Sequence, residues 1–305
     1  MNATLTEIQG LLVGHYTDEA AQTGCTAILC PNGAVAGVDV RGSAPGTRET
    51  DLLRGYNVVE KVNAILLSGG SAFGLDAAGG AMQYLEERGL GISVGPTVVP
   101  IVPAAVIMDL TEGDAHTRPG KAEGYAACAA ASAEPVAQGR VGAGTGATVS
   151  KAFGLQYARK GGVGSCCLYL SGGVKVAALL VVNALGDIYD PATGELRAAA
   201  VLNGKPTPCF DSPALSGVGF GNTTIGVVAT NARLTREEAN KLASMGHDGL
   251  AMAIRPVHTS MDGDTLFGLA TGEVEAPFLP ILAAAAQAAA QAVLLAVEHG
   301  GGMLP

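Results

Sequence analysis

The segment with the clearest chemical potential joins Asn222 to Thr223. It follows a glycine-rich stretch and leads directly into the apolar, β-branched run at 225–230. A threonine hydroxyl is a weak nucleophile unless a base lies beside it. Cleavage of the Asn222–Thr223 bond would create one, the α-amine of Thr223, with a pKa near ~8. The pattern predicts either a self-cleaving junction with Thr223 as nucleophile or an inert loop that enters a core strand.

The residues before Thr223 could give the chain the geometry that self-cleavage requires. A strained turn containing Gly219, Gly221 and Asn222 would let the Thr223 hydroxyl reach the carbonyl of Asn222. Its attack would form an ester that water hydrolyses, leaving the fragments 1–222 and 223–305.

Two carboxylates form a second candidate group. Asp262 and Asp264 flank Gly263 just before an apolar run. The Asp-Gly pair is typical of a turn, and the acidic residues that a calcium loop needs are missing, so no metal site is predicted. The remaining interpretation is a pair that orients a nucleophile or binds a substrate amine. His258, nearby, is interpreted as structural, because the five histidines show no catalytic order.

Lys151 ends the glycine-rich segment 140–151. That segment lacks the Gly-Lys-Ser/Thr of a phosphate loop and the strand and downstream acid of a dinucleotide site, so no nucleotide or other cofactor is predicted. Lys151 is either a solvated loop charge or a group that approaches the substrate.

Composition narrows the class of function. The 305 residues are 48% hydrophobic and 15% charged, which favours a large buried core over disorder. A net charge of −9 without a Lys/Arg cluster disfavours nucleic-acid binding. The six cysteines have no CxxC spacing, so we expect buried thiols rather than zinc ligands or disulfides. The N-terminal segment 1–10 lacks the features of a signal peptide, which predicts a cytoplasmic protein.

The elements that position these residues follow from the hydrophobic pattern. Short apolar runs predict strands at 26–29, 35–40, 62–67, 163–170, 174–182, 225–230 and 265–270. Helices are expected at 71–89, 119–134, 234–254 and 278–297. Several strands are hydrophobic without polar alternation, which indicates an α/β sandwich whose sheets are buried on both faces.

Two segments bear on organisation. The Pro- and Gly-rich stretch 203–222 predicts a loop, and the 83 residues after it are too few for an ordinary second domain, so residues 1–305 are expected to form a single domain. The alanine-rich segment 278–297 is apolar enough for a membrane span, but Gln287 and Gln291 interrupt it. We interpret it as a buried helix, with Pro280 in its first turn and glycines at its end.

Taken together, the motifs resemble, nearly from end to end, the self-processing hydrolases of the DmpA-like L-aminopeptidase/D-esterase family, which includes β-peptidyl aminopeptidases and nylon-oligomer hydrolases. The matching stretches are 37–53, 67–78, 102–110, 142–151, 178–187, 221–232 and 258–267. The resemblance implies a layered αββα sandwich of the DmpA/ornithine acetyltransferase type. It also implies self-cleavage between Asn222 and Thr223 into two chains, and a homo-oligomer of the cleaved heterodimers.

The resemblance also assigns roles. Thr223 is the N-terminal nucleophile and its amine the general base. Asn183 is an oxyanion donor, a kind of group whose loss costs ~10²–10³ in rate. Lys151 lies near the nucleophile, and Asp262 and Asp264 form the acidic pair.

The sequence departs from the family pattern at two positions. Met108 stands where some members carry a tyrosine that assists the oxyanion, and a methionine donates no hydrogen bond. Ser150 replaces the usual glycine before the lysine.

The expected function is hydrolysis of small peptides or amides. The alternatives are an acyltransferase of the ornithine acetyltransferase type and a non-catalytic binding protein on the same fold.

Overall fold

The computed structural model describes residues 3–211 and 221–304. Its α-helices are α1 (Ala77–Glu86), α2 (Lys121–Ala129), α3 (Arg236–Ala253) and α4 (Phe278–Gly300). The longer strands are β1 (Leu12–Asp18), β2 (Thr23–Val40), β4 (Lys61–Ser68), β10 (Gly162–Tyr169), β11 (Lys175–Asn183), β16 (Thr223–Ala232) and β18 (Thr265–Val274). Short strands are β3 (Thr47–Arg48), β5 (Ile92–Ser93), β6 (Val98–Val99), β7 (Ala104–Val106), β8 (Thr148–Val149), β9 (Arg159–Lys160), β12 (Asp187–Tyr189), β13 (Leu196–Ala198), β14 (Ala200–Leu202), β15 (Lys205–Thr207) and β17 (Ile254–Arg255).

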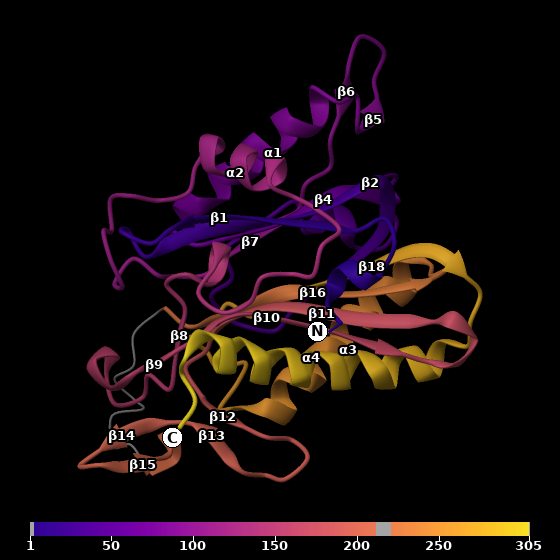
Figure 1. Ribbon diagram of the computed structural model, residues 1–305. Helices are drawn as coiled ribbons and strands as arrows, with labels where there is room; N and C mark the ends of the chain where they lie inside the picture. Colours follow the sequence, from indigo (N-terminus) through magenta and orange to yellow (C-terminus); the bar gives the residue numbers. More distant parts are fainter. Residues whose placement is uncertain (1–2, 212–220, 305) are drawn as a thin grey trace.

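The main sheet has the strand order β10-β11-β16-β18-β2-β4-β7-β3, with β1 also paired to β2. Strand β2 is long enough to belong to two layers. Its first part, to Leu29, pairs with β1 and β4. Pairing with β4 resumes at Ala34 and Val35, and the last part, from Val35, pairs with β18. Figure 1 shows the result: β1, β4 and β7 lie in an upper layer, and β10, β11, β16 and β18 lie in a lower one.

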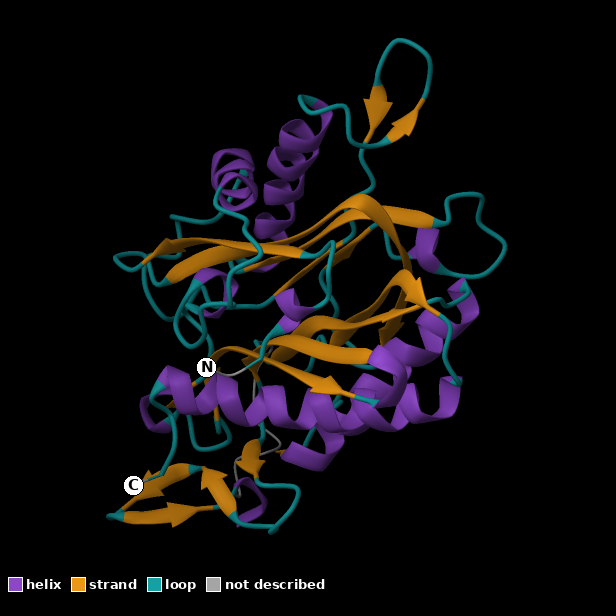
Figure 2. Ribbon diagram, turned by 45° about the vertical axis from the view of Figure 1, so that its right-hand side comes forward, coloured by secondary structure: helices purple, strands orange, loops and turns teal. Residues whose placement is uncertain are grey.

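Helices cover the outer face of each layer, α1 and α2 above and α3 and α4 below (Figure 2). Side chains alternate across each strand, so a strand buried on both faces supplies two cores. In β11, Val176, Ala178 and Leu180 pack with α3 and α4. The intervening Ala177, Leu179 and Val181 pack between the two layers. The layered αββα sandwich expected from the sequence is confirmed.

Several local predictions hold. Helix α3 lies within the helix expected at 234–254, and it begins with a capping box in which the side chains and backbone N–H groups of Thr235 and Glu238 bond reciprocally. Helix α4 runs to Gly300 and ends at Gly301, in the left-handed conformation that favours glycine. The six cysteines are free and buried.

Two predictions need correction. The strands expected at 26–29 and 35–40 are one strand, β2, which continues through Pro31 with a register shift between Leu29 and Ala34. The stretch 203–222 is not wholly loop, because β15 pairs with β14 in a hairpin. The turn residue Gly219 lies outside the described residues.

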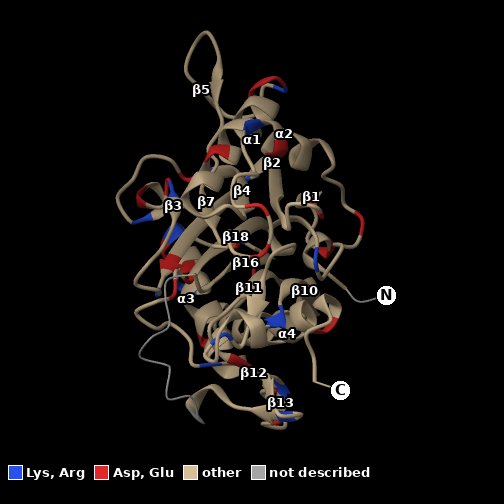
Figure 3. Ribbon diagram, turned by 90° about the vertical axis from the view of Figure 1, so that its left-hand side faces the viewer, with Lys and Arg blue, Asp and Glu red and all other residues tan. Residues whose placement is uncertain are grey.

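Helix α4 is the one described helix that is long and apolar enough to span a membrane by length and composition. Gly164 of β10 allows this helix to approach the sheet closely, because a Cβ at Gly164 would lie only 2.0 Å from the Ala292 carbonyl oxygen. Charged side chains lie mainly on loops and helices, with both signs intermingled, and the projecting β5–β6 hairpin carries none (Figure 3).

Candidate active site

The predicted site residues meet where three adjacent strands begin or end. Thr223 is the first residue of β16 and pairs with Asn183, the last residue of β11. On the other side, Asn222 forms a parallel bridge with Asp262, just before β18. The sheet therefore brings together three segments that are far apart in the sequence.

Lys151 is buried, and its ammonium nitrogen donates three hydrogen bonds. The acceptors are the Asn183 carbonyl at 2.9 Å, the Asn183 Oδ1 at 2.8 Å and the Gly221 carbonyl at 3.0 Å. Burial lowers the pKa of Lys151 from 10.5 to about 7, and the charges of Glu112, Asp262 and Asp109 oppose that shift. Lys151 is therefore buried at the Asn222–Thr223 junction rather than solvated in a loop, and its role toward a substrate stays a prediction.

The Asn183 side chain is fixed at both ends. Its Oδ1 accepts from the Thr148 N–H at 3.0 Å as well as from Lys151. Its Nδ2 donates to the Gly221 carbonyl at 3.1 Å and the Met108 carbonyl at 3.2 Å. Lys151 and Asn183 thus both bind the carbonyl one residue before the predicted cleavage bond. The oxyanion role of Asn183 stays a prediction.

The carbonyl of Asn222 itself has different partners. The Gly263 N–H donates to it at 3.0 Å, and the Thr223 hydroxyl also donates to it. The nucleophile candidate therefore lies against the carbonyl group that self-cleavage requires it to attack. Gly263 was not identified as a donor from the sequence, because a backbone N–H has no residue-type signature.

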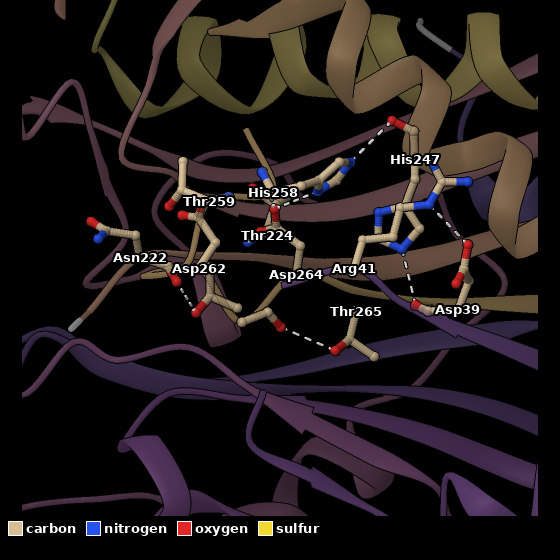
Figure 4. A network of polar contacts seen from close by, with 12 residues as sticks. Asp39, Arg41, Asn222, Thr224, His247, His258, Thr259, Asp262, Asp264 and Thr265 are labelled. Atoms are coloured by element: carbon tan, nitrogen blue, oxygen red, sulfur yellow. Dashed lines mark hydrogen bonds and ion pairs between the residues drawn. The ribbon is translucent and has the colours of Figure 1, made fainter. Parts of the chain in front are cut away.

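The two carboxylates have separate hydrogen-bond partners (Figure 4). Asp264 accepts from the Thr224 N–H at 2.6 Å, and its other oxygen accepts from His258. Asp262 accepts from the Thr259 N–H at 2.6 Å. Burial, and next the charge of Asp264, raise the pKa of Asp262 to about 6.

Because the pKa of Asp262 is raised in the folded protein, its ionisation is predicted to lower the free energy of unfolding as the pH rises. Ionised Asp262 destabilises the fold, an effect that is absent below pH 3.8 and grows until the pH has passed about 6. In an uncleavable Thr223→Ala background, we expect Asp262→Asn to raise the free energy of unfolding at pH 7.5 by up to about 3 kcal/mol and to change it little at pH 4. Urea titrations at both pH values measure this. The control is Asp51→Asn at an exposed carboxylate, and an equal gain at both pH values would contradict the prediction.

A cavity of about 240 Å³ opens at the junction. Its lining is Ala44, Pro45, Gly46, Ser71, Ala72, Val106, Ile107, Met108, Gly221, Asn222, Thr223 and Met261. Met108 lines this cavity, and a Cβ at Gly221 would be 3.4 Å from its methyl group. The place of Met108 in a substrate pocket stays a prediction. None of the lining side chains is charged. Within 3–211 and 221–304, no group of three or more His, Cys, Asp or Glu side chains could hold a metal ion.

The chain is similar to known proteins in both sequence and fold. The sequence model of the family described as Peptidase family S58 matches residues 3–303 of this chain. An uncharacterised aminopeptidase of Mycobacterium tuberculosis (strain ATCC 25618 / H37Rv) is 45% identical, with 90% of this chain and 83% of that protein covered. A 6-aminohexanoate-oligomer endohydrolase of Kocuria sp. (strain KY2) is 35% identical, with 90% of this chain and 76% of that protein covered.

Solved structures share the fold. A β-aminopeptidase of Burkholderia sp. superposes with a TM-score of 0.71 at 21% identity, covering 100% of this chain and 91% of that one. The L-aminopeptidase D-Ala-esterase/amidase of Ochrobactrum anthropi, a variant of the Ntn hydrolase fold, superposes with a TM-score of 0.72 at 18% identity, covering 97% and 86%. At this level of identity the likeness concerns the fold alone. The family match over almost the whole chain and the two relatives with 45% and 35% identity show that the protein belongs to peptidase family S58 and hydrolyses peptide or amide bonds.

Proposed function

We propose that the protein cleaves itself between Asn222 and Thr223 and then hydrolyses small peptides or amides through an acyl ester on Thr223. One observation carries the proposal: the Thr223 hydroxyl lies against the Asn222 carbonyl while the Gly263 N–H donates to the same oxygen. A donor placed on a carbonyl oxygen also stabilises the negative charge that attack would develop there.

Self-cleavage needs only groups in the chain and one water. The Thr223 oxygen bonds to the Asn222 carbonyl carbon, its proton passes to the departing nitrogen, and the peptide C–N bond breaks. Water then hydrolyses the ester, leaving a carboxyl group on Asn222 and a free α-amine on Thr223. Before the cut, Gly221 and Asn222 line the cavity, so the chain's own segment occupies the place of an acyl substrate.

In the cleaved enzyme, the new amine takes the hydroxyl proton as Thr223 attacks the substrate carbonyl. A free α-amine has a pKa near ~8, so much of it is unprotonated at neutral pH. Withdrawal of Gly221 would free Lys151 and Asn183, which bind its carbonyl in the uncleaved chain, to bind the substrate. The acyl-threonine ester then passes its acyl group to water.

The fragments 1–222 and 223–305 are proposed to stay together as one domain. In the sheet order, β16 and β18 from the second fragment lie between β11 and β2 from the first. Separation would break the ladders on both sides of this strand pair and expose two cores.

The cavity supports a substrate with a short, mostly apolar acyl chain. Its described lining is mostly apolar, and its volume of about 240 Å³ suits a short chain rather than a folded protein segment. The relatives named aminopeptidase and 6-aminohexanoate-oligomer endohydrolase fit this class. Aminoacyl nitroanilides and short ω-amino acid oligomers are therefore the substrates to compare.

Mass spectrometry of the purified chain over time tests self-cleavage. We expect fragments of about 22 and about 8 kDa, in proportion to the whole chain of 30.4 kDa, and their masses should sum to that of the precursor plus one water molecule. N-terminal sequencing of the smaller fragment should begin at Thr223. A chain that stays intact after long incubation contradicts the proposal. In the assays, acyl transfer to added ornithine in preference to water would indicate the acyltransferase alternative.

A further inference from the structure

His258 holds the carboxylate of Asp264 with two hydrogen bonds. Its ring Nδ1 lies 2.7 Å from Asp264 Oδ2, and its backbone N–H donates to the same oxygen at 3.2 Å. The other oxygen of Asp264 accepts the Thr224 N–H. The Asp264 side chain is 2% exposed, so these protein groups rather than water set its orientation. Since the carboxylate accepts hydrogen bonds at both oxygens, Nδ1 is the donor to it.

Asp264 in turn fixes the residue next to the nucleophile. The parallel ladder between β16 and β18 starts only at Ile225, which pairs with Thr265. The Thr224 N–H therefore lies beyond the ladder, and Asp264 supplies its acceptor at 2.6 Å. This N–H belongs to the peptide group that follows Thr223. Its orientation limits where the Thr223 hydroxyl and the proposed α-amine can lie.

The His258 ring also contacts His247. It packs edge-on against the ring of His247, with centroids 4.8 Å apart, and its Nε2 lies 3.4 Å from the His247 carbonyl oxygen (Figure 4). His247 is buried and bonds through Nε2 to the Asp39 carbonyl at 2.9 Å. Burial lowers the pKa of His247 to about 4, so it is neutral near pH 7.

The backbone of His258 supports a special role. Its φ is +55°, in the left-handed region that only a few per cent of residues other than glycine adopt. Such a conformation persists only where the surrounding contacts require it, and it occurs often at functional sites. Here it allows the backbone N–H and the ring of one residue to reach the same carboxylate oxygen.

We propose that His258 is a positioning residue that acts through Asp264: its Nδ1–H holds the carboxylate in the orientation that aligns the Thr223–Thr224 peptide for nucleophilic attack. The inference rests on the proposed role of Thr223. No bond forms or breaks at His258, and its proton stays on Nδ1. His258 does not line the cavity, so it should affect the rate of attack rather than substrate binding.

A matched pair of variants tests this. His258→Asn and His258→Asp have nearly the same shape and tolerate the left-handed backbone, but only asparagine offers an N–H donor to Asp264. We expect His258→Asn to self-cleave within about tenfold of the wild-type rate and His258→Asp to be slower by roughly 10²-fold, the scale of loss from a misplaced reacting group. In the cleaved fraction of His258→Asp, kcat for substrate hydrolysis should fall below that of the wild type, and KM should stay the same.

Chemical rescue supplies a second readout. His258→Gly keeps the backbone conformation and removes the ring. We expect imidazole to restore its self-cleavage, and thiazole, a ring of similar size without an N–H, to fail. His116→Gly, at an exposed histidine far from the site in sequence, controls for general effects of imidazole.

The outcomes separate the two proposals. Equal rates for the asparagine and aspartate variants, or equal rescue by both rings, would overturn the role of His258 while leaving Thr223 as nucleophile. Failure of the wild-type chain to cleave would instead contradict the proposed function. If His258→Gly does not fold, the asparagine and aspartate variants alone decide.

Discussion

A chain carrying Thr223→Ala is expected to remain a single polypeptide of 30.4 kDa and to lose measurable hydrolysis. The substitution removes the hydroxyl that lies against the Asn222 carbonyl, and with it both the attacking oxygen and the route to the α-amine. Removing a nucleophile that acts together with its base lowers the rate by roughly 10³-fold or more. Intact-mass spectrometry measures the cut, and release of nitroaniline measures turnover.

The matched control is Thr223→Ser, which keeps the hydroxyl and removes one methyl group. We expect it to self-cleave and to turn over substrate, each within about tenfold to 10²-fold of the wild type, because the methyl group restricts the rotamer of threonine. Hydrolysis by the uncut alanine variant at the wild-type rate would show that the nucleophile is another residue.

Substitution Gly263→Ala should slow self-cleavage by about 10²–10³-fold, the usual cost of losing one oxyanion donor. A Cβ at this position would lie 2.7 Å from the Ala44 carbonyl oxygen and 3.0 Å from the Thr223 hydroxyl oxygen. The loop must shift to relieve both contacts, and the shift moves the Gly263 N–H away from the Asn222 carbonyl, now 3.0 Å distant. The rate of appearance of the smaller fragment measures the effect.

Gly55→Ala is the control for this prediction, because a Cβ there meets nothing within 4 Å. It should cleave at the wild-type rate. A Gly263→Ala chain that folds, as judged by circular dichroism, and still cleaves at that rate would exclude the Gly263 N–H as a contributor.

Much of the fold could be predicted because the signals are local. The capping box of Thr235 and Glu238 marks the start of α3, and Gly301 marks the end of α4. The hydrophobic pattern also indicated sheets buried on both faces. It did not indicate that β2 is one strand, because a proline such as Pro31 is typical of a break. The strand is seen to continue only from its pairing with β4 on both sides of Pro31.

The site was predictable in its residue types and not in its contacts. The structure brings Lys151, Asn183 and Thr223 together, as the resemblance implied. That Lys151 and Asn183 bind the Gly221 carbonyl depends on strand register, which single-sequence patterns do not encode. His258 was interpreted as structural because its link to Asp264 depends on a left-handed backbone conformation that the sequence does not reveal.

If the chain is cut as proposed, the interleaved strand order has a kinetic consequence for the cleaved protein. The uncut chain folds as one molecule, since β16 is tethered to β11 through the segment between them. After the cut, the same sheet can form only when two separate polypeptides collide, so refolding becomes second order and slows with dilution. Maturation would therefore make the active enzyme unable to recover from unfolding at low concentration. Its working lifetime would then be set by how slowly it unfolds rather than by its equilibrium stability.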